Sequence, residues 1–319
     1  MYIIGIDEAG YGPNLGPLVV SGSVWSFSPA ETTENPVDAL AKRLFESGAI
    51  AKSPKTQGAI FIADSKIVYK NGLLGPLLDT VLSILQPCQP EGGWTSRNLF
   101  TFLDPDCEAA MYENPWDQEY CEPLVTPPQI ARQFQAALAV AKIEPPRLFS
   151  KVVFPREFNE SVEHFGSKGT AHAHWVLGLL RRIFDQLPPS DVPVLVLSDK
   201  LGARNRYASL IYPFFEGTMI QTVQENAEKS EYRFSFGRQA VNLSFQVRGE
   251  RFLPVALASM TAKLLRELAM RSFNAFWQKC LPDLRETAGY PVDAKRFLGE
   301  ITPYLKEYQI SESLLWRNK

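Results

Sequence analysis

The stretch Tyr2-Ile3-Ile4-Gly5-Ile6-Asp7-Glu8-Ala9-Gly10-Tyr11-Gly12-Pro13 opens the chain and decides its fold. Its apolar, β-branched run predicts a strand that ends at two adjacent carboxylates and a glycine-rich turn. Neighbouring carboxylates raise each other's pKa unless a cation or strong hydrogen-bond donors keep them ionised. The pair therefore indicates a site for a hard divalent cation, Mg²⁺ or Mn²⁺. In the alternative interpretation, Asp7 and Glu8 lie in a solvated turn, where Gly10 and Gly12 supply unusual backbone angles.

Composition limits the classes of protein to consider. The chain has 319 residues, of which 45% are hydrophobic, so it can bury a substantial core. No apolar stretch approaches the length needed to cross a bilayer, and Met1 leads directly into the first strand. We therefore expect a cytoplasmic protein, a monomer with no membrane contact. The net charge of -2 argues mildly against binding nucleic acid through the overall field, but a local basic face is compatible with it.

The remaining pattern predicts an α/β fold, a central mixed β-sheet flanked by helices. Strands are predicted at 18–25, 151–154 and 192–197, the last ending at Asp199, and a β-hairpin at 230–247. Helices are predicted at 37–45, 129–142, 174–187 and 253–277. An acid after a buried strand lies where open α/β sheets bind ligands, although a plain turn aspartate is commoner. We expect one domain over 1–319, with insertions at about 86–128 and 215–247.

Four segments resemble the signature of the ribonuclease HII family. In that family the Asp-Glu pair is followed by Ala-Gly-Arg-Gly-Pro, then Gly-Pro and a second strand, and this chain differs mainly at Tyr11. The other three segments are Asp64-Ser65-Lys66, Ala262-Lys263-Leu264-Leu265-Arg266-Glu267 and Gly289-Tyr290-Pro291. Glu267 stands where Asp is usual. Ribonuclease HIII also has Glu as its fourth acid and no Arg at the Tyr11 position, so the chain resembles a divergent family member with some HIII-like features.

The resemblance implies a ribonuclease H-like fold and a type 2 ribonuclease H activity. Such an enzyme is an endonuclease that hydrolyses the RNA strand of RNA/DNA hybrids and leaves 5′-phosphate ends. By resemblance, Asp7, Glu8, Asp199 and Glu267 are the catalytic residues and hold two Mg²⁺ or Mn²⁺ ions. The implied substrate-binding residues are Gly10, Tyr11 and Gly12 near the 2′-hydroxyl, Lys66 near phosphate, Tyr290 near the sugar, and also Ser65 and Lys263.

Each of these assignments has a plainer alternative. Lys263 and Glu267 are four residues apart, so they can form an ordinary helical ion pair. Glu250 is a rival for the fourth acid, and the longer Glu267 side chain would require the helix or the metal to shift. Tyr290 can be a turn-packing aromatic residue, and Asp64 can be a helix N-cap.

Two other functions compete with hybrid hydrolysis. One is a catalytically reduced, nucleic-acid-binding relative of ribonuclease HII, and the other is a metal-dependent nuclease that acts on DNA junctions. Serine, cysteine or zinc hydrolase chemistry finds little support, because His164, His172 and His174 have no convincing partners in the sequence. We expect those histidines to be structural or surface residues.

Overall fold

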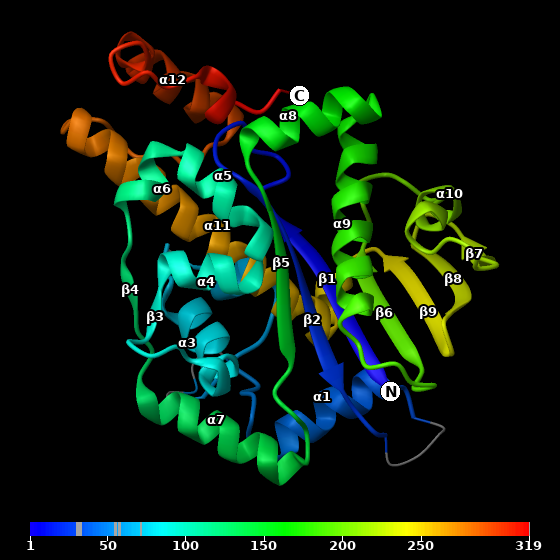
Figure 1. The fold of residues 1–319 in the computed structure, drawn as a ribbon. Coiled ribbons are helices and arrows are strands. Elements are labelled where there is room, and N and C mark those ends of the chain that lie inside the picture. The colour runs from blue at the N-terminus through cyan, green and yellow to red at the C-terminus, as the bar shows by residue number, and fades with distance from the viewer. Residues whose placement is uncertain (30–33, 54–55, 57–58, 71, 319) are drawn as a thin grey trace.

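The computed structural model describes residues 1–29, 34–53, 56, 59–70 and 72–318. Within these residues, seven strands form one mixed sheet in the order β5-β2-β1-β6-β9-β8-β7 (Figure 1). The strands are β1 (Tyr2–Ala9), β2 (Leu18–Ser26), β5 (Arg147–Val153), β6 (Val194–Asp199), β7 (Gln221–Glu225), β8 (Lys229–Phe236) and β9 (Gln239–Gln246). A separate small ladder pairs β3 (Trp94–Thr95) with β4 (Pro123–Leu124).

The pairing directions bring distant acidic residues to one edge of the sheet. β1 is antiparallel to β2 and parallel to β6, and β6 is parallel to β9. Ile6 of β1 pairs with Ser198 of β6, so the next residues along, Asp7 and Asp199, lie side by side. The carboxyl ends of the parallel strands β1 and β6 therefore meet at the predicted acidic site.

Helices cover both faces of the sheet. They are α1 (Pro36–Glu46), α2 (Ser65–Val68), α3 (Gly75–Ile84), α4 (Ser96–Leu103), α5 (Glu108–Glu113), α6 (Pro115–Glu119), α7 (Pro128–Ala141), α8 (Pro155–Phe165), α9 (Lys168–Asp185), α10 (Ala208–Ile211), α11 (Leu253–Cys280) and α12 (Pro291–Leu305). Within the part of the chain described, no helix has the length and apolar character that crossing a membrane requires.

The long helix α11 packs directly on β1. A Cβ atom added at Gly5 would lie 2.1 Å from the Pro254 carbonyl carbon, so only glycine allows this approach. Ile3 and Val255 belong to the core on this face, whereas Ile4 and Val176 belong to the core beneath α9 on the other face. Successive residues of β1 therefore point alternately toward α11 and toward α9.

The predicted fold class is confirmed: the chain is α/β, with a central mixed sheet flanked by helices. The predicted hairpin is also confirmed, since β8 and β9 pair around the turn at Gly237. Helix α9 starts six residues before its predicted start, because Ser167 Oγ caps it by accepting a hydrogen bond from the Thr170 amide at 3.2 Å. The segment 86–128 forms several short helices and the β3–β4 ladder. Its status as an insertion, like that of 215–247, stays a prediction.

Candidate active site

Asp7 and Asp199 point to the same face of the sheet, toward α11. Asp7 follows Ile3 by four residues on β1, and Asp199 follows Leu197 by two on β6, and both apolar residues lie in the core beneath α11. Burial, and then the charges of Glu8 and Asp199, hold the pKa of Asp7 well above its ordinary value, although a hydrogen bond with Ser259 opposes the shift. Burial and the two neighbouring carboxylates thus disfavour the ionised form of Asp7.

The Asp64-Ser65-Lys66 segment is linked to this site by Ser259, which contacts both Ser65 and Asp7. The hydroxyl of Ser259 on α11 donates to Ser65 Oγ at 3.0 Å, and both side chains are buried. Asp64 caps α2 by accepting a hydrogen bond from the Lys66 amide at 2.9 Å, as the plainer interpretation expected. Lys66 itself is exposed. The structure therefore places Ser65 against the same stretch of α11 as Asp7.

Gly249 is part of the site, although no sequence pattern predicted it. Its amide donates to Asp199 Oδ1 at 3.0 Å, and an added Cβ would lie 2.9 Å from the Asp199 Cα atom. Glu250, the rival for the fourth acid, follows it in the short 3₁₀-helix Gly249–Arg251. Glu250 lines a surface groove together with Asp64.

Glu8 points to the other face of the sheet, toward α9. Its Oε2 atom lies 3.6 Å from Nε2 of the buried His172, and the Tyr11 ring packs on the His172 ring with centroids 4.7 Å apart. His172 is buried, as expected for a structural histidine, and α9 brings it onto β1 beside Glu8. His174 is exposed and packs on Phe165 and Phe214.

Glu267 is engaged by two neighbouring side chains. Tyr69 donates to its Oε2 atom at 2.8 Å, and Lys263 donates to its Oε1 atom at 2.5 Å, so the plain helical ion pair is present. Glu267 follows Ser259 by eight residues, which is about 12 Å along a helix axis. Among the described residues, no group of three or more His, Cys, Asp or Glu side chains is arranged to hold a metal ion.

The glycine loop, residues 10–17, is fixed from behind by a buried arginine. Arg266 donates to the carbonyl oxygens of Pro17 at 2.6 Å, Leu15 at 3.3 Å and Ala288 at 2.9 Å. Gly10 has φ +89°, and an added Cβ would lie 2.7 Å from Arg266 Cδ. Gly12, in contrast, is exposed and has no atom within 4 Å of an added Cβ. The outer side of the loop, around Gly12, therefore leaves space for a ligand to approach the loop backbone closely.

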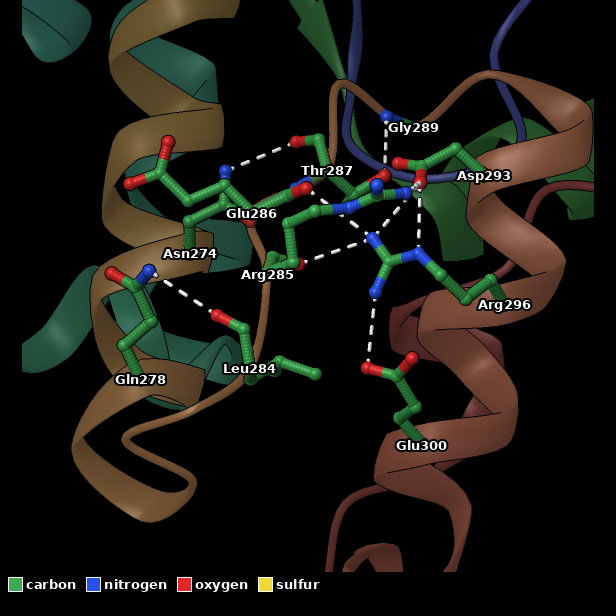
Figure 2. Close-up of polar contacts among 10 residues, drawn as sticks. All are labelled: Asn274, Gln278, Leu284, Arg285, Glu286, Thr287, Gly289, Asp293, Arg296 and Glu300. Atoms are coloured by element: carbon green, nitrogen blue, oxygen red, sulfur yellow. Dashed lines mark hydrogen bonds and ion pairs between the residues drawn. The ribbon is translucent and has the colours of Figure 1, made fainter.

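Tyr290 lies beside this loop. The Gly289 carbonyl accepts hydrogen bonds from the amides of Asn14 at 2.8 Å and Leu15 at 3.3 Å. Figure 2 shows how the segment is held: Asn274 on α11 exchanges two hydrogen bonds with the Thr287 backbone, each 3.0 Å long. The Gly289 amide in turn donates to Thr287 Oγ1 at 3.0 Å. Tyr290 follows with 57% of its surface exposed, next to the loop and accessible to a ligand.

Arg317 is a second buried arginine on the glycine loop. It donates to the carbonyl oxygens of Gly10 at 2.7 Å and of Pro13, and its backbone amide donates to the Asn14 carbonyl at 2.8 Å. Burial, and then the charge of Arg266, lower the pKa of Arg317 well below its ordinary value. Sequence reasoning missed this residue, because an isolated arginine far from every motif carries no signal.

Similarity to known proteins is found among solved structures. A scan against protein-family models and a search of curated proteins find no match. Among solved structures, the chain is similar to ribonuclease HII of Archaeoglobus fulgidus in its complex with PCNA, with 15% identity, a TM-score of 0.44, and coverage of 100% of this chain and 95% of that chain. For ribonuclease H2 of Pyrococcus horikoshii OT3, identity is 15%, the TM-score 0.44 and coverage 99% and 92%. For Bst-RNase HIII in complex with Mn²⁺, identity is 11%, the TM-score 0.43 and coverage 99% and 66%.

In the order β5-β2-β1-β6-β9, β2 runs antiparallel to the other four of these described strands. Strands β8 and β7 extend it at one edge. This topology explains why β1 and β6 end together, and hence why Asp7 and Asp199 are neighbours.

Proposed function

We propose that the chain is a divalent-metal-dependent endonuclease, a type 2 ribonuclease H, that hydrolyses the RNA strand of RNA/DNA hybrids. The observation that supports it most is the environment of Asp7. This carboxylate is buried, and the charges of Glu8 and Asp199 both raise its pKa. A buried acidic cluster without a cation is costly unless a metal ion binds there.

The side chains at this edge suit Mg²⁺ or Mn²⁺, because carboxylate oxygens are the ligands that these ions prefer. Asp7 and Asp199 would be the central ligands, and Glu8 and Glu267 are proposed as the further ones. When bound, such ions activate a water molecule and stabilise the leaving oxygen of a phosphodiester. The proposed products have 5′-phosphate and 3′-hydroxyl ends.

The glycine loop would read the sugar of the RNA strand. Recognition of RNA in a hybrid requires contact with the 2′-hydroxyl, and the open side of the loop at Gly12 lets backbone groups approach it. Tyr290 would pack on a neighbouring sugar, because it lies beside the loop and is exposed. Lys66, exposed next to the buried Ser65, would contact phosphate.

Cleavage assays test this proposal. A continuous RNA/DNA hybrid and a DNA duplex with one ribonucleotide are incubated with Mg²⁺, with Mn²⁺ and with a chelator, and the ends of the products are mapped. We expect metal-dependent cleavage of the hybrid that leaves 5′-phosphates. Asp7→Asn should lower the rate by more than about 100-fold while hybrid binding persists. Asp191→Asn, at the exposed amino end of β6, is the matched control and should leave the rate unchanged. Full activity of Asp7→Asn would refute the site assignment.

A second candidate function is a catalytically reduced relative that binds nucleic acid. It is favoured by Glu267, whose two carboxylate oxygens are already engaged by Tyr69 and Lys263. In that case both duplexes would bind tightly, and neither would be cut with any metal. Tyr69→Phe then provides a further comparison, because cleavage that appears in this variant would show that the Tyr69 hydrogen bond had withheld Glu267.

A further inference from the structure

A row of polar side chains starts at Asp199 and crosses the sheet away from β1. The pairing of β6 with β9 places Asp199 opposite Gln246, and the pairing of β9 with β8 places Gln246 opposite Lys229. Side chains of residues paired in this way point to the same face of a sheet, so all three lie on the face toward α11. Neighbouring strands are about 4.8 Å apart, which places Lys229 roughly 10 Å from Asp199.

A groove, here named the sheet groove, lies over this part of the sheet. Its volume is about 1270 Å³, and residues of β6, β9 and β8 line it. Helix α11 packs on β1 and β2 (Figure 1), so the sheet groove lies beside the helix. The lining includes Gln246 and Lys229 of the polar row, together with Arg233 and Arg251. The sheet groove therefore continues from the acidic edge of the sheet.

Positive charge exceeds negative charge in the sheet groove. Nζ of Lys229 lies 2.6 Å from Oε2 of the buried Glu231, and Nη2 of Arg233 lies 3.4 Å from Oε1 of the same carboxylate. Two cations therefore share one acid. Arg251 adds a third cation and Glu34 a second acid. These five residues leave one positive charge in excess, which favours an anionic ligand.

Two arginines carry the accessible part of this charge. Arg233 and Arg251 are both exposed. Arg251 lies close to the acidic edge, because it ends the short helix that begins at Gly249, whose amide donates to Asp199 Oδ1. Its Nη2 atom donates to Gln246 Oε1 at 3.4 Å. A planar guanidinium can bind two phosphate oxygens at once, so both side chains suit a phosphate group.

The length of the sheet groove matches a short run of nucleotides. Arg233 follows Lys229 by four residues along β8, which is about 13 Å in a strand. Together with the distance across the strands, this places Arg233 roughly 16 Å from Asp199. At about 3.4 Å per nucleotide, the span corresponds to about five nucleotides of one strand. A strand whose reactive phosphate lies at Asp199 can therefore extend along the sheet groove.

We infer that the sheet groove binds the phosphate backbone of the nucleic acid that flanks the cleavage site on one side, through Arg251 close to the site and Arg233 farther along. This inference rests on the proposed function, because it takes a strand that is cut at Asp199 as the ligand. It makes Arg251 and Arg233 substrate-binding residues. The same charges would attract an acidic protein segment, and the experiment separates that alternative from a nucleic acid.

Salt-dependent binding tests the inference. The full-length protein is titrated with a fluorescent RNA/DNA hybrid in the presence of a chelator, so that the hybrid stays uncut. Arg233→Gln combined with Arg251→Gln should lower the slope of log K against log salt by roughly 1.4 to 1.8, since two phosphate contacts are lost. The affinity gained between about 200 and about 50 mM salt should then fall roughly tenfold. Arg132→Gln combined with Arg238→Gln is the matched control, because both arginines are exposed and lie outside the sheet groove. It removes the same charge and should keep the slope.

Substrate length separates a flanking contact from a structural role. Duplexes with one short RNA tract carry a DNA flank of about two or about ten base pairs, placed on each side in turn. With the long flank on the side of the sheet groove, the double variant should raise KM roughly tenfold and leave kcat nearly unchanged. With the short flank, the wild type and the variant should have the same KM, because no phosphate reaches Arg233. A variant with a distorted site would lose activity at both lengths.

The outcomes for the two proposals are distinguishable. Cleavage by the wild-type protein, with slope and KM unchanged in the double variant, would overturn this inference and leave the proposed function intact. That result is also expected if the sheet groove binds an acidic protein segment. Equal rises in KM with short and long flanks would overturn the inference as well. Binding without cleavage, with the slope reduced in the double variant, would reject the nuclease and support the backbone contact. A wild-type protein that does not bind the hybrid would overturn both.

Discussion

Replacement of Gly289 by alanine should be far more damaging than its exposed surroundings suggest. Gly289 has φ +82°, and a left-handed backbone costs an L-residue about 1 to 2 kcal/mol. An added Cβ would also lie 2.5 Å from the Leu15 carbonyl oxygen and 3.1 Å from its carbon, both backbone atoms that cannot rotate away. Relief of this overlap costs about 1 to 3 kcal/mol more. It also stretches the hydrogen bonds from Asn14 and Leu15 to the Gly289 carbonyl.

Together, the backbone strain and the steric overlap predict that Gly289→Ala lowers the free energy of unfolding by about 2 to 4 kcal/mol. This figure allows for the smaller conformational entropy that alanine has in the unfolded chain. Equilibrium urea unfolding, followed by tryptophan fluorescence, measures this change. Gly237→Ala is the matched control for the backbone angle alone, since Gly237 has φ +59° and no atom within 4 Å of an added Cβ. It should cost only about 1 kcal/mol.

Gly299→Ala is the control without either penalty, because Gly299 lies inside α12 with open space around it. It should stabilise the protein by about 0.5 to 1 kcal/mol. Equal losses for Gly289→Ala and Gly237→Ala would show that the Gly289 segment does not pack on Leu15, and the reasoning that places Tyr290 beside the glycine loop would fail with it.

Three further predictions concern the acids and the second buried arginine. A hydrogen bond from Arg296, with others from Thr287 and Arg285, lowers the pKa of Asp293 to about 2. The resulting stability is complete above the ordinary aspartate pKa of about 3.9 and is lost as the pH falls through the lowered value. In urea titrations, Asp293→Asn should therefore cost about 1 kcal/mol at neutral pH, allowing for solvent screening, and progressively less below pH 4. Arg317→Met should change the free energy of unfolding by less than about 2 kcal/mol, because the lost hydrogen bonds are offset by removal of a buried charge. Its KM for hybrid should rise, and an unchanged KM would show that the Gly10 and Pro13 carbonyls need no such support. Mg²⁺ at 100 times its Kd should raise the wild-type Tm by roughly 5 °C, whereas Asp7→Asn should show almost no rise in the same thermal scan.

The sequence predicted those parts of the fold that depend on local pattern. Strand β1, helix α11 and the β8–β9 hairpin follow from apolar periodicity and turn residues. The proximity of Asp7 and Asp199 could be expected as well, because both follow apolar strands and the carboxyl ends of parallel strands meet.

Contacts between separate segments could not be predicted from pattern. The hydrogen bond from Tyr69 to Glu267 joins residues 198 apart, and its formation depends on how α2 docks on α11. The approach of Gly249 to Asp199 depends in the same way on the path of the chain after β9. The approach of His172 to Glu8 likewise depends on how α9 packs on β1. Contacts of this kind form only when the elements pack together, and no local sequence pattern marks the residues that make them.

The contact between β1 and α11 limits how this site can change in evolution. Gly5 meets the Pro254 backbone at one end of the interface, and Gly10 meets Arg266 at the other, so the helix cannot slide along the strand without a collision. The position of the Glu267 backbone relative to the sheet is therefore fixed. Rotation of the Glu267 side chain is the way in which its carboxylate can change place within this rigid frame.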